Sequence, residues 1–311
     1  GSEAIEIIVA GDWVSGPDTA ELDRFLAHHP RIRHLRVSYD RGDSSRKKNA
    51  GWEAASSDVI AFMDDDVRVP PEWIGRIRAC FTSPDVGIAS GPGLVPEDLP
   101  LIPWLAGHAL ASPAAGYASR RYRADDAPPR PAPWSAIIGC NMAFRREVLE
   151  QIGGFSPDFW PGEEMRAAHE AVHERGWTLM FDPGAGLWHY PRPTLRGFGR
   201  QMFTYGATRI RLLRAGAAWE WTPLLPAAGL ETMFWLALAS LWFPIVRPIA
   251  VGLAAVYALA LIVFALGKIR ECGARAVELP PMMAYMHLSY ALGAWSEILR
   301  PGRDFGTSRT F

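Results

Sequence analysis

The stretch Ile60–Val67 reads IAFMDDDV and places three consecutive acids directly after four apolar residues. Residues 59–63 have the composition of a short buried strand, and Pro70-Pro71 then open a helix. The acids therefore occupy a turn at the end of a core strand. Because successive side chains of an extended chain point to opposite sides, Asp64 and Asp66 project together while the acid between them turns away.

Two convergent carboxylates at Asp-x-Asp spacing repel each other unless a cation lies between them. Oxygen ligands suit a hard divalent ion, so the pair is a candidate site for Mg²⁺ or Mn²⁺, and such an ion can clamp a diphosphate. Two plainer explanations stay open at this point. Asp66 could cap the helix after Pro70, or the three acids could form a solvated turn.

Composition limits the classes of protein to consider. The 311 residues can bury a sizeable core, as one large domain or two smaller ones. A net charge of -1 argues against general attraction to nucleic acid. The three cysteines form no C-x-x-C pair, so neither a zinc site nor a disulfide framework is indicated.

Up to about residue 190, apolar runs alternate with amphipathic stretches, which predicts an α/β domain with a mainly parallel sheet. The predicted strands are 6–10, 34–37, 59–63 and 178–181, and residues 136–145 are predicted as strand and turn. The predicted helices are 18–28, 45–56, one after 70–71, 147–152 and 163–175. Residues 93–133 are rich in Pro, Ala and Arg without clear periodicity. We expect a long, partly mobile loop there that shapes a binding cleft.

The composition changes after residue 214. Residues 224–243 contain one acid and residues 249–266 no charge; at about 1.5 Å per residue the second segment covers roughly 27 Å, close to the thickness of a bilayer core. A transmembrane hairpin is predicted, with a buried core hairpin as the alternative. Basic residues flank both ends, so the preceding domain is expected on the cytoplasmic side. A third apolar segment, 279–299, either spans the membrane or lies along its interface.

Four segments together resemble the family-2 glycosyltransferases, inverting enzymes with the GT-A nucleotide-diphospho-sugar transferase fold. They are EIIVAGD (6–12), RKKNAGWEAASSDVIAFMDDDV (46–67), GCNMAFRREVLEQIGGF (139–155) and PGEEMRAAHEAVHERGW (161–177). HYPRP (189–193) and RQMFTYG (200–206) resemble the closing segment of membrane-associated bacterial exopolysaccharide glycosyltransferases. The Gln-x-x-Arg-Trp motif of processive synthases is absent, which favours one sugar added per encounter.

The resemblance implies roles for individual residues. Glu164 is the expected catalytic base, in a pair with Glu163. The expected metal ligands are Asp64, Asp66 and His189. The expected contacts of the donor are Asp12, Lys48, Asn49, Gly51, Asp65, Asn141 and Arg200. Structural alternatives stay open: the two glutamates could complement a helix dipole, the basic residues could be a solvated helix face or lie at the membrane surface, and His189 could be structural.

The resemblance also implies the partners and the domain boundaries. We expect a nucleoside-diphosphate sugar as donor, Mg²⁺ or Mn²⁺ as cofactor, and a lipid-linked or saccharide acceptor in exopolysaccharide or cell-envelope glycan synthesis. Membrane lipids and polysaccharide-assembly proteins are further expected partners, at the cytoplasmic (inner) membrane. Residues 1–215 would form the transferase domain, beginning after the family's first strand, and 216–311 the membrane region. The competing readings are a polyprenyl-phosphate sugar synthase, a nucleotidyltransferase and a catalytically silent membrane scaffold.

Overall fold

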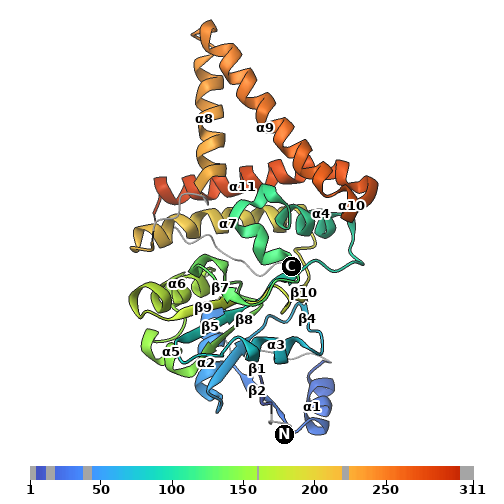
Figure 1. Cartoon of the computed structure of the whole chain (residues 1–311), viewed down its shortest axis with the longest axis vertical. Helices are drawn as coiled ribbons and strands as arrows, with labels where there is room; N and C mark the ends of the chain where they lie inside the picture. Colours follow the sequence, from blue (N-terminus) through green and yellow to red (C-terminus); the bar gives the residue numbers. More distant parts are fainter. Residues whose placement is uncertain (1–4, 12–17, 38–43, 160, 219–223, 302–311) are drawn as a thin grey trace.

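The computed structural model describes residues 5–11, 18–37, 44–159, 161–218 and 224–301. Figure 1 shows three parts stacked along the long axis: an α/β body, two long helices that cross above it, and an upright pair of helices. The helical part is drawn mainly from residues after 194, with an earlier segment, residues 101–122, packed beside them.

The body begins with a parallel pair of strands, β1 (Ile7–Gly11) and β2 (Ile32–Arg36). Helix α1 (Asp18–His28) connects them, and α2 (Ser44–Ala54) follows β2. The predicted helix 18–28 is confirmed residue for residue, and the other three elements lie within two residues of their predicted bounds.

The central sheet has the strand order β3-β8-β5-β9-β7. Its strands are β3 (Val59–Phe62), β5 (Val86–Ser90), β7 (Arg130–Pro131), β8 (Met142–Arg145) and β9 (Thr178–Phe181). The prediction of a mainly parallel sheet is wrong. Three of the hydrogen-bonded strand pairs in this sheet, β3–β8, β8–β5 and β9–β7, are antiparallel, and only the pair β5–β9 is parallel. The last residue of β5, Ser90, pairs with the first residue of β8, Met142. The chain therefore leaves the sheet and re-enters it at the same end, so β8 runs in the direction opposite to β5.

A smaller sheet lies at that end of the central sheet. It contains β4 (Val67–Arg68), β6 (Gly93–Leu94) and β10 (Leu187–His189) in the order β4-β10-β6. The short helices of the body are α3 (Trp73–Ala79), η2 (Trp134–Ala136), α5 (Arg146–Ile152), η3 (Pro157–Phe159) and α6 (Glu163–His169), which continues in the π-helical turn η4 (Glu170–Glu174). Helix α5 ends where predicted, at Gly153, whose φ of 70° suits glycine.

The prediction of a loop over residues 93–133 is wrong for most of that segment. It contains helix α4 (Leu101–Leu110) and the 3₁₀ segment η1 (Pro113–Tyr122). Residues 103–110 of α4 are all buried, so its sequence LIPWLAGHAL is apolar all round and shows no amphipathic period. Pro103 lies in the first turn, where its missing N–H removes no helical hydrogen bond.

Helices α7 (Leu195–Arg214) and α11 (Leu279–Leu299) form the middle layer. Glycines allow their backbones to approach closely. A Cβ on Gly206 would lie 2.0 Å from the carbonyl oxygen of Tyr290, and a Cβ on Gly293 would lie 1.8 Å from that of Phe203. The third apolar segment of the sequence is therefore the helix that packs along α7 and crosses the base of the upright pair (Figure 1).

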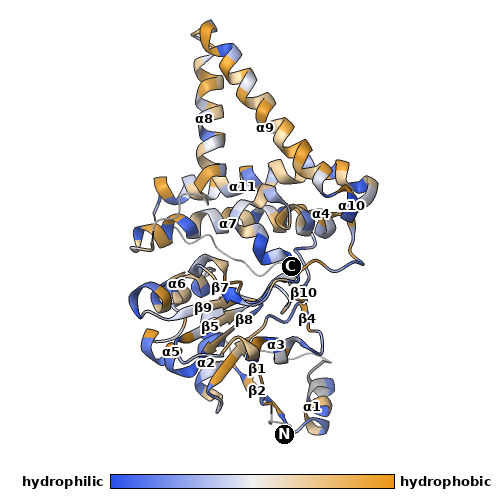
Figure 2. Cartoon of the chain, in the orientation of Figure 1, coloured by the Kyte–Doolittle hydropathy of each residue, from blue (hydrophilic) through white to orange (hydrophobic). Residues whose placement is uncertain are grey.

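The upright pair consists of α8 (Leu225–Ala239) and α9 (Arg247–Gly267), joined through η6 (Pro244–Val246); α10 (Ile269–Cys272) and η7 (Gly273–Glu278) lead on to α11. Figure 2 shows that both helices are largely apolar, although they stand away from the body. The segment Pro244–Gly267 has a mean hydropathy of 2.7 and is 11% buried. The alternative of a buried core hairpin is therefore wrong. Within the described ranges this is the one helix both long and apolar enough to cross a membrane.

Candidate active site

The acidic turn after β3 lies beside the end of β10. Strand β10 pairs with β4 so that His189 is opposite Val67, and the Tyr190 N–H donates to the carbonyl oxygen of Asp66 at 3.1 Å. This pairing joins segments more than 120 residues apart in the sequence. It brings ligand atoms of Asp64, Asp66 and His189 within 4.8 Å of one another. The three residues expected from the sequence to bind a metal are thus adjacent.

The donor set fits a divalent cation. Oδ1 of Asp66 is buried and has no hydrogen-bond partner among the described residues, and it lies 3.4 Å from Nε2 of His189. Burial, together with the charge of Asp66, raises the pKa of Asp64 even though Lys48 opposes it. Burial would also raise the pKa of Asp66, but His189 outweighs it and the pKa is lowered. Two carboxylates and an imidazole are ligands that Mn²⁺ and Mg²⁺ sites use, and an ion there would satisfy the buried oxygen.

The helix-cap alternative for Asp66 is not supported. Helix α3 begins at Trp73, its N-cap residue is Glu72, and no side chain makes a capping hydrogen bond. Asp66 is six residues before that N-cap and its carboxylate faces His189 instead.

The second acidic group lies at the N-terminus of α6. The Glu163 carboxylate is buried and accepts hydrogen bonds from Lys48 Nζ at 2.8 Å, from the Gly162 N–H at 3.0 Å and from the Ser44 hydroxyl. Burial alone would raise its pKa, but the Lys48 ammonium and these hydrogen bonds hold the pKa below its ordinary value. The Lys48 ammonium and these hydrogen bonds thus favour the charged form of the Glu163 carboxylate.

Glu164 has the opposite environment. Burial and the neighbouring charge of Glu163 raise its pKa to about 7, although Lys48 and Arg121 oppose the increase. Two adjacent carboxylates whose pKa values are driven apart in this way are typical of an acid–base site. Of the two glutamates, Glu164 is the one whose pKa lies near neutral pH.

Lys48 connects the two acidic groups. Burial would lower its pKa, but the charges of Glu163, Asp64 and Glu164 raise it above its ordinary value. The loop at Gly139 closes the same space: a Cβ at this position would lie 3.5 Å from Cδ of Glu164 and 3.6 Å from Lys48 Nζ. The candidate base, the lysine and the acidic turn thus line one region.

Several residues expected to contact the donor are placed differently. Asn49 exchanges two hydrogen bonds of 2.8 Å with the backbone of Phe155, so its side chain holds the loop after α5. Asn141 is completely buried; its Oδ1 accepts from Trp73, and its Nδ2 donates to two carbonyl groups at 2.8 and 3.0 Å. These amides are used within the fold, so the geometry supports a structural role over direct donor contact.

The remaining predicted residues lie at the surface or outside the description. Gly51 packs against β1, where a Cβ would lie 3.9 Å from Cβ of Ala10. Asp65 and Arg200 are exposed. Asp12 lies outside the described residues.

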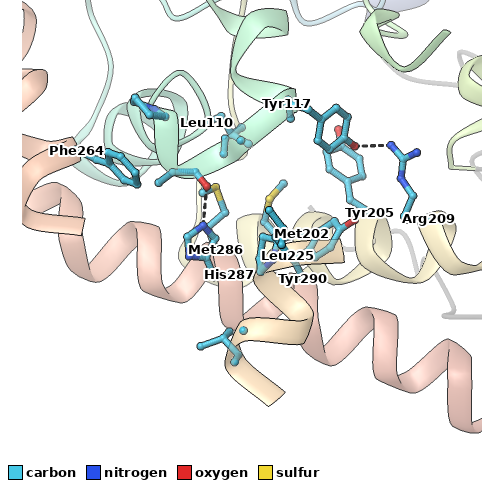
Figure 3. A pocket seen from close by; sticks show the side chains of 18 of the residues that line it. Leu110, Tyr117, Met202, Tyr205, Arg209, Leu225, Phe264, Met286, His287 and Tyr290 are labelled. Atoms are coloured by element: carbon cyan, nitrogen blue, oxygen red, sulfur yellow. Dashed lines mark hydrogen bonds between the residues drawn. The ribbon is translucent and has the colours of Figure 1, made fainter. Parts of the chain in front are cut away.

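The sequence reasoning missed a set of residues on the other side of Glu164. A cavity of about 450 Å³ is lined by Glu164, Arg121, Tyr205 and Arg209 and by residues of the α8–α9 pair. Figure 3 shows Tyr205 and Arg209 among its lining side chains. Arg121 is on η1, in the segment predicted to be a loop, and the Arg120-Arg121-Tyr122 run is the sequence signal that could have indicated it.

Comparisons with known proteins agree with this architecture. The sequence profile of Glycosyl transferase family group 2 matches residues 59–267, two thirds of the chain. Pre-mycofactocin glycosyltransferase of Mycobacterium tuberculosis is 24% identical over 76% of this chain. The match spans only 51% of that relative's length. Succinoglycan biosynthesis protein ExoM of Rhizobium meliloti is 25% identical over 76% of this chain and 75% of its own.

Among solved structures, mannosyltransferase PcManGT from Pyrobaculum calidifontis, in complex with GDP-Man and Mn²⁺, superposes with a TM-score of 0.52. The identity is 19%, and the match covers 93% of this chain and 77% of that one, so the shared fold extends beyond the α/β body. The fold, the family profile and the relatives together show that this chain belongs to the family-2 glycosyltransferases of the GT-A fold.

Proposed function

We propose that the chain transfers a single sugar from a nucleoside-diphosphate sugar to an acceptor hydroxyl, with inversion at the anomeric carbon. The observation that carries this proposal is the position of Lys48, which links the Asp64–Asp66–His189 cluster to the Glu163–Glu164 pair. The site thus contains Asp66, whose buried Oδ1 has no hydrogen-bond partner among the described residues, and Glu164, whose pKa is about 7.

In this proposal Asp64, Asp66 and His189 hold Mn²⁺ or Mg²⁺. When bound, the ion neutralises the diphosphate of the donor and makes the nucleoside diphosphate a better leaving group. Glu164 accepts the proton of the acceptor hydroxyl as that oxygen bonds to the anomeric carbon, and the bond from this carbon to the diphosphate oxygen breaks. Glu163 keeps Lys48 charged and in place, and Lys48 adds positive charge beside the leaving group.

We further propose that α8 and α9 insert into the cytoplasmic (inner) membrane. Large apolar side chains on the two helices, among them Phe234, Ile249 and Leu259, are more than half exposed, a pattern that suits hydrocarbon as the surrounding solvent. Arg211 and Arg214 precede the pair and Lys268 and Arg270 follow it, which favours a transferase domain on the cytoplasmic side. Residues 1–215 would be the transferase domain and 216–311 the membrane region.

The acceptor is proposed to be lipid-linked or a saccharide, in exopolysaccharide or cell-envelope glycan synthesis. ExoM, whose name describes succinoglycan biosynthesis, is one relative that supports this. A polyprenyl-phosphate sugar synthase is the second candidate, favoured by the cavity that connects Glu164 with the apolar helix pair.

The test is a donor screen with the full chain in detergent. Nucleoside diphosphate release is measured for a panel of nucleotide sugars with and without Mn²⁺, for the wild type, Asp66→Asn, and Asp58→Asn as an exposed-acid control. We expect Mn²⁺-dependent release with at least one donor, lost in Asp66→Asn and kept in Asp58→Asn. Release of inorganic diphosphate would instead identify a nucleotidyltransferase, and absence of Mn²⁺-dependent donor binding would identify a silent scaffold.

A further inference from the structure

The cavity beside Glu164 has two chemically different ends. Figure 3 shows Leu110, Phe264 and Met286 around one end and Tyr117 and Arg209 at the other. The apolar end is formed by α4, α9 and α11 and adjoins the α8–α9 pair. The polar end adjoins the proposed catalytic base.

Two buried guanidinium groups mark the polar end. Arg121 is 6% exposed and Arg209 is 2% exposed. The ring of Tyr117 lies beside both, with its centroid 5.4 Å from Cζ of Arg121 and 5.0 Å from Cζ of Arg209, and its hydroxyl accepts a hydrogen bond from Arg209. Two positive charges are therefore held close together on one aromatic ring inside the protein.

Arg121 is incompletely satisfied by the protein. Its Nη1 donates to the carbonyl oxygen of Ile137 at 3.3 Å, whereas its buried Nε has no partner among the residues described. In the described part of the chain no salt bridge is formed by Arg121, and the one carboxylate whose charge acts on it is Glu164. A buried guanidinium with an unpaired N–H is costly, so a ligand anion at this position would be favoured.

The apolar end cannot serve such an anion, but it suits a hydrocarbon chain. Leu253, Leu261 and Phe264 of α9 line it, together with methionines of α7 and α11, whose flexible side chains adapt to irregular apolar ligands. A ligand that fills the cavity must therefore carry an anionic group near Glu164 and a long apolar part directed towards the helix pair.

We infer that this cavity binds the acceptor substrate, a saccharide carried on a polyprenyl phosphate or diphosphate. Its phosphate group lies between Arg121 and Arg209, its hydrocarbon chain occupies the apolar end, and the saccharide hydroxyl that accepts the new sugar is presented to Glu164, which takes its proton. The inference rests on the proposed function and narrows it, because it selects a lipid-linked anionic acceptor over a free saccharide and assigns the residues that select it.

The experiment measures lipid binding by native mass spectrometry of the full chain in detergent. The probes are a polyprenyl monophosphate, the matching polyprenol and phosphatidylglycerol. The wild type is expected to prefer the polyprenyl monophosphate over both. In Arg121→Met this preference over the polyprenol should fall by roughly tenfold to a hundredfold, the range for hydrogen bonds to charged groups.

A second variant tests the apolar end independently of the charge. Gly229 lines the cavity, and a Cβ there meets no atom within 4 Å, so Gly229→Phe places a ring in the cavity without a backbone clash. It should weaken binding of both polyprenyl probes at least tenfold. Gly252→Phe is the matched control, because Gly252 is equally exposed and unobstructed but does not line the cavity, and binding should be unchanged.

Wild-type affinity for the polyprenyl monophosphate in Gly229→Phe would overturn the inference, as would equal binding of phosphatidylglycerol. Mn²⁺-dependent binding of a nucleotide sugar, measured on the same samples, reports the proposed function separately. If the wild type shows no Mn²⁺-dependent donor binding, the proposed function is refuted. If it binds the donor but does not prefer the polyprenyl monophosphate, only the assignment of the cavity is refuted.

Discussion

Replacing Glu164 by Gln tests the assignment of the catalytic base. The pKa of Glu164 is about 7, because of burial and the charge of Glu163. Turnover of the wild type should therefore fall about tenfold for each pH unit below about 6, where the carboxylate is protonated. Glu164→Gln should lose roughly 10²- to 10⁴-fold in turnover at pH 8 with nearly normal donor binding, the usual contribution of a general base.

Glu163→Gln tests whether the charge of Glu163 raises the pKa of Glu164. Removing its charge lowers the pKa of Glu164, so the acid side of the pH profile should move to lower pH. Glu174→Gln, which removes an exposed charge at the end of η4, five residues after the last residue of α6, is the matched control and should leave the profile unchanged. The assay is nucleoside diphosphate release between pH 5 and about 9 in the presence of Mn²⁺.

Glu164→Gln should also change the free energy of unfolding, in a direction that follows from the pKa of Glu164. The folded-state pKa of Glu164 lies above the ordinary 4.5, so the folded protein binds this proton more tightly than the unfolded chain. The associated stability is present below the unfolded-state pKa and is lost as pH rises to about 7, a loss of up to about 3 kcal/mol. Glu164→Gln should therefore be more stable than the wild type at pH 8. Retention of most of the turnover in Glu164→Gln, with a pH profile like the wild type's, would refute the reasoning.

Three further predictions concern the framework. Asn141→Ala leaves the Trp73 indole N–H and the Ala185 carbonyl unpaired, while the Pro92 carbonyl keeps the Leu187 N–H as donor, and should lower the free energy of unfolding by roughly 3 kcal/mol, at about 1–3 kcal/mol for each unsatisfied buried group; a thermal midpoint within a degree of the wild type's would contradict this structural role of Asn141. Gly293→Ala should separate α7 from α11 and lower the melting temperature in detergent, whereas Gly252→Ala should not; equal effects would argue against close packing. Leu259→Arg, at an exposed position of α9, should reduce membrane recovery on fractionation, because an arginine near the centre of a spanning helix costs about 3 kcal/mol; unchanged recovery would count against insertion.

Local signals in the sequence were sufficient for the elements near the site. Helix 18–28 and strand 178–181 have their predicted bounds because each has clear periodicity or composition and is bounded by polar or turn-forming residues. The acidic turn was found for the same reason, since IAFMDDDV changes abruptly from apolar to acidic. His189 was connected with the metal site only through the family resemblance, and the strand pairing of β4 with β10 supplies the geometry.

Features that depend on distant pairing could not be predicted in this way. The direction of β8 follows from the chain's return to the end of the sheet that it left at Ser90, which no local pattern encodes. Helix α4 is buried on every side and so lacks the amphipathic signal of a surface helix. The Asn141 amide resembles a ligand-binding group in sequence but is consumed by three internal hydrogen bonds. The sequence did not indicate that Arg121 lies near Glu164, because that proximity depends on the position of η1 in the folded chain.

The central claim is that Asp64, Asp66 and His189 hold a divalent ion, and pulsed electron paramagnetic resonance of bound Mn²⁺ tests it most directly. The account predicts that Mn²⁺ binds the wild type and shows coupling to an imidazole nitrogen. This coupling should vanish in His189→Gln and persist in His173→Gln, which alters a histidine outside the site. Mn²⁺ that does not bind the wild type, or binds without a nitrogen signal that depends on His189, would contradict the account.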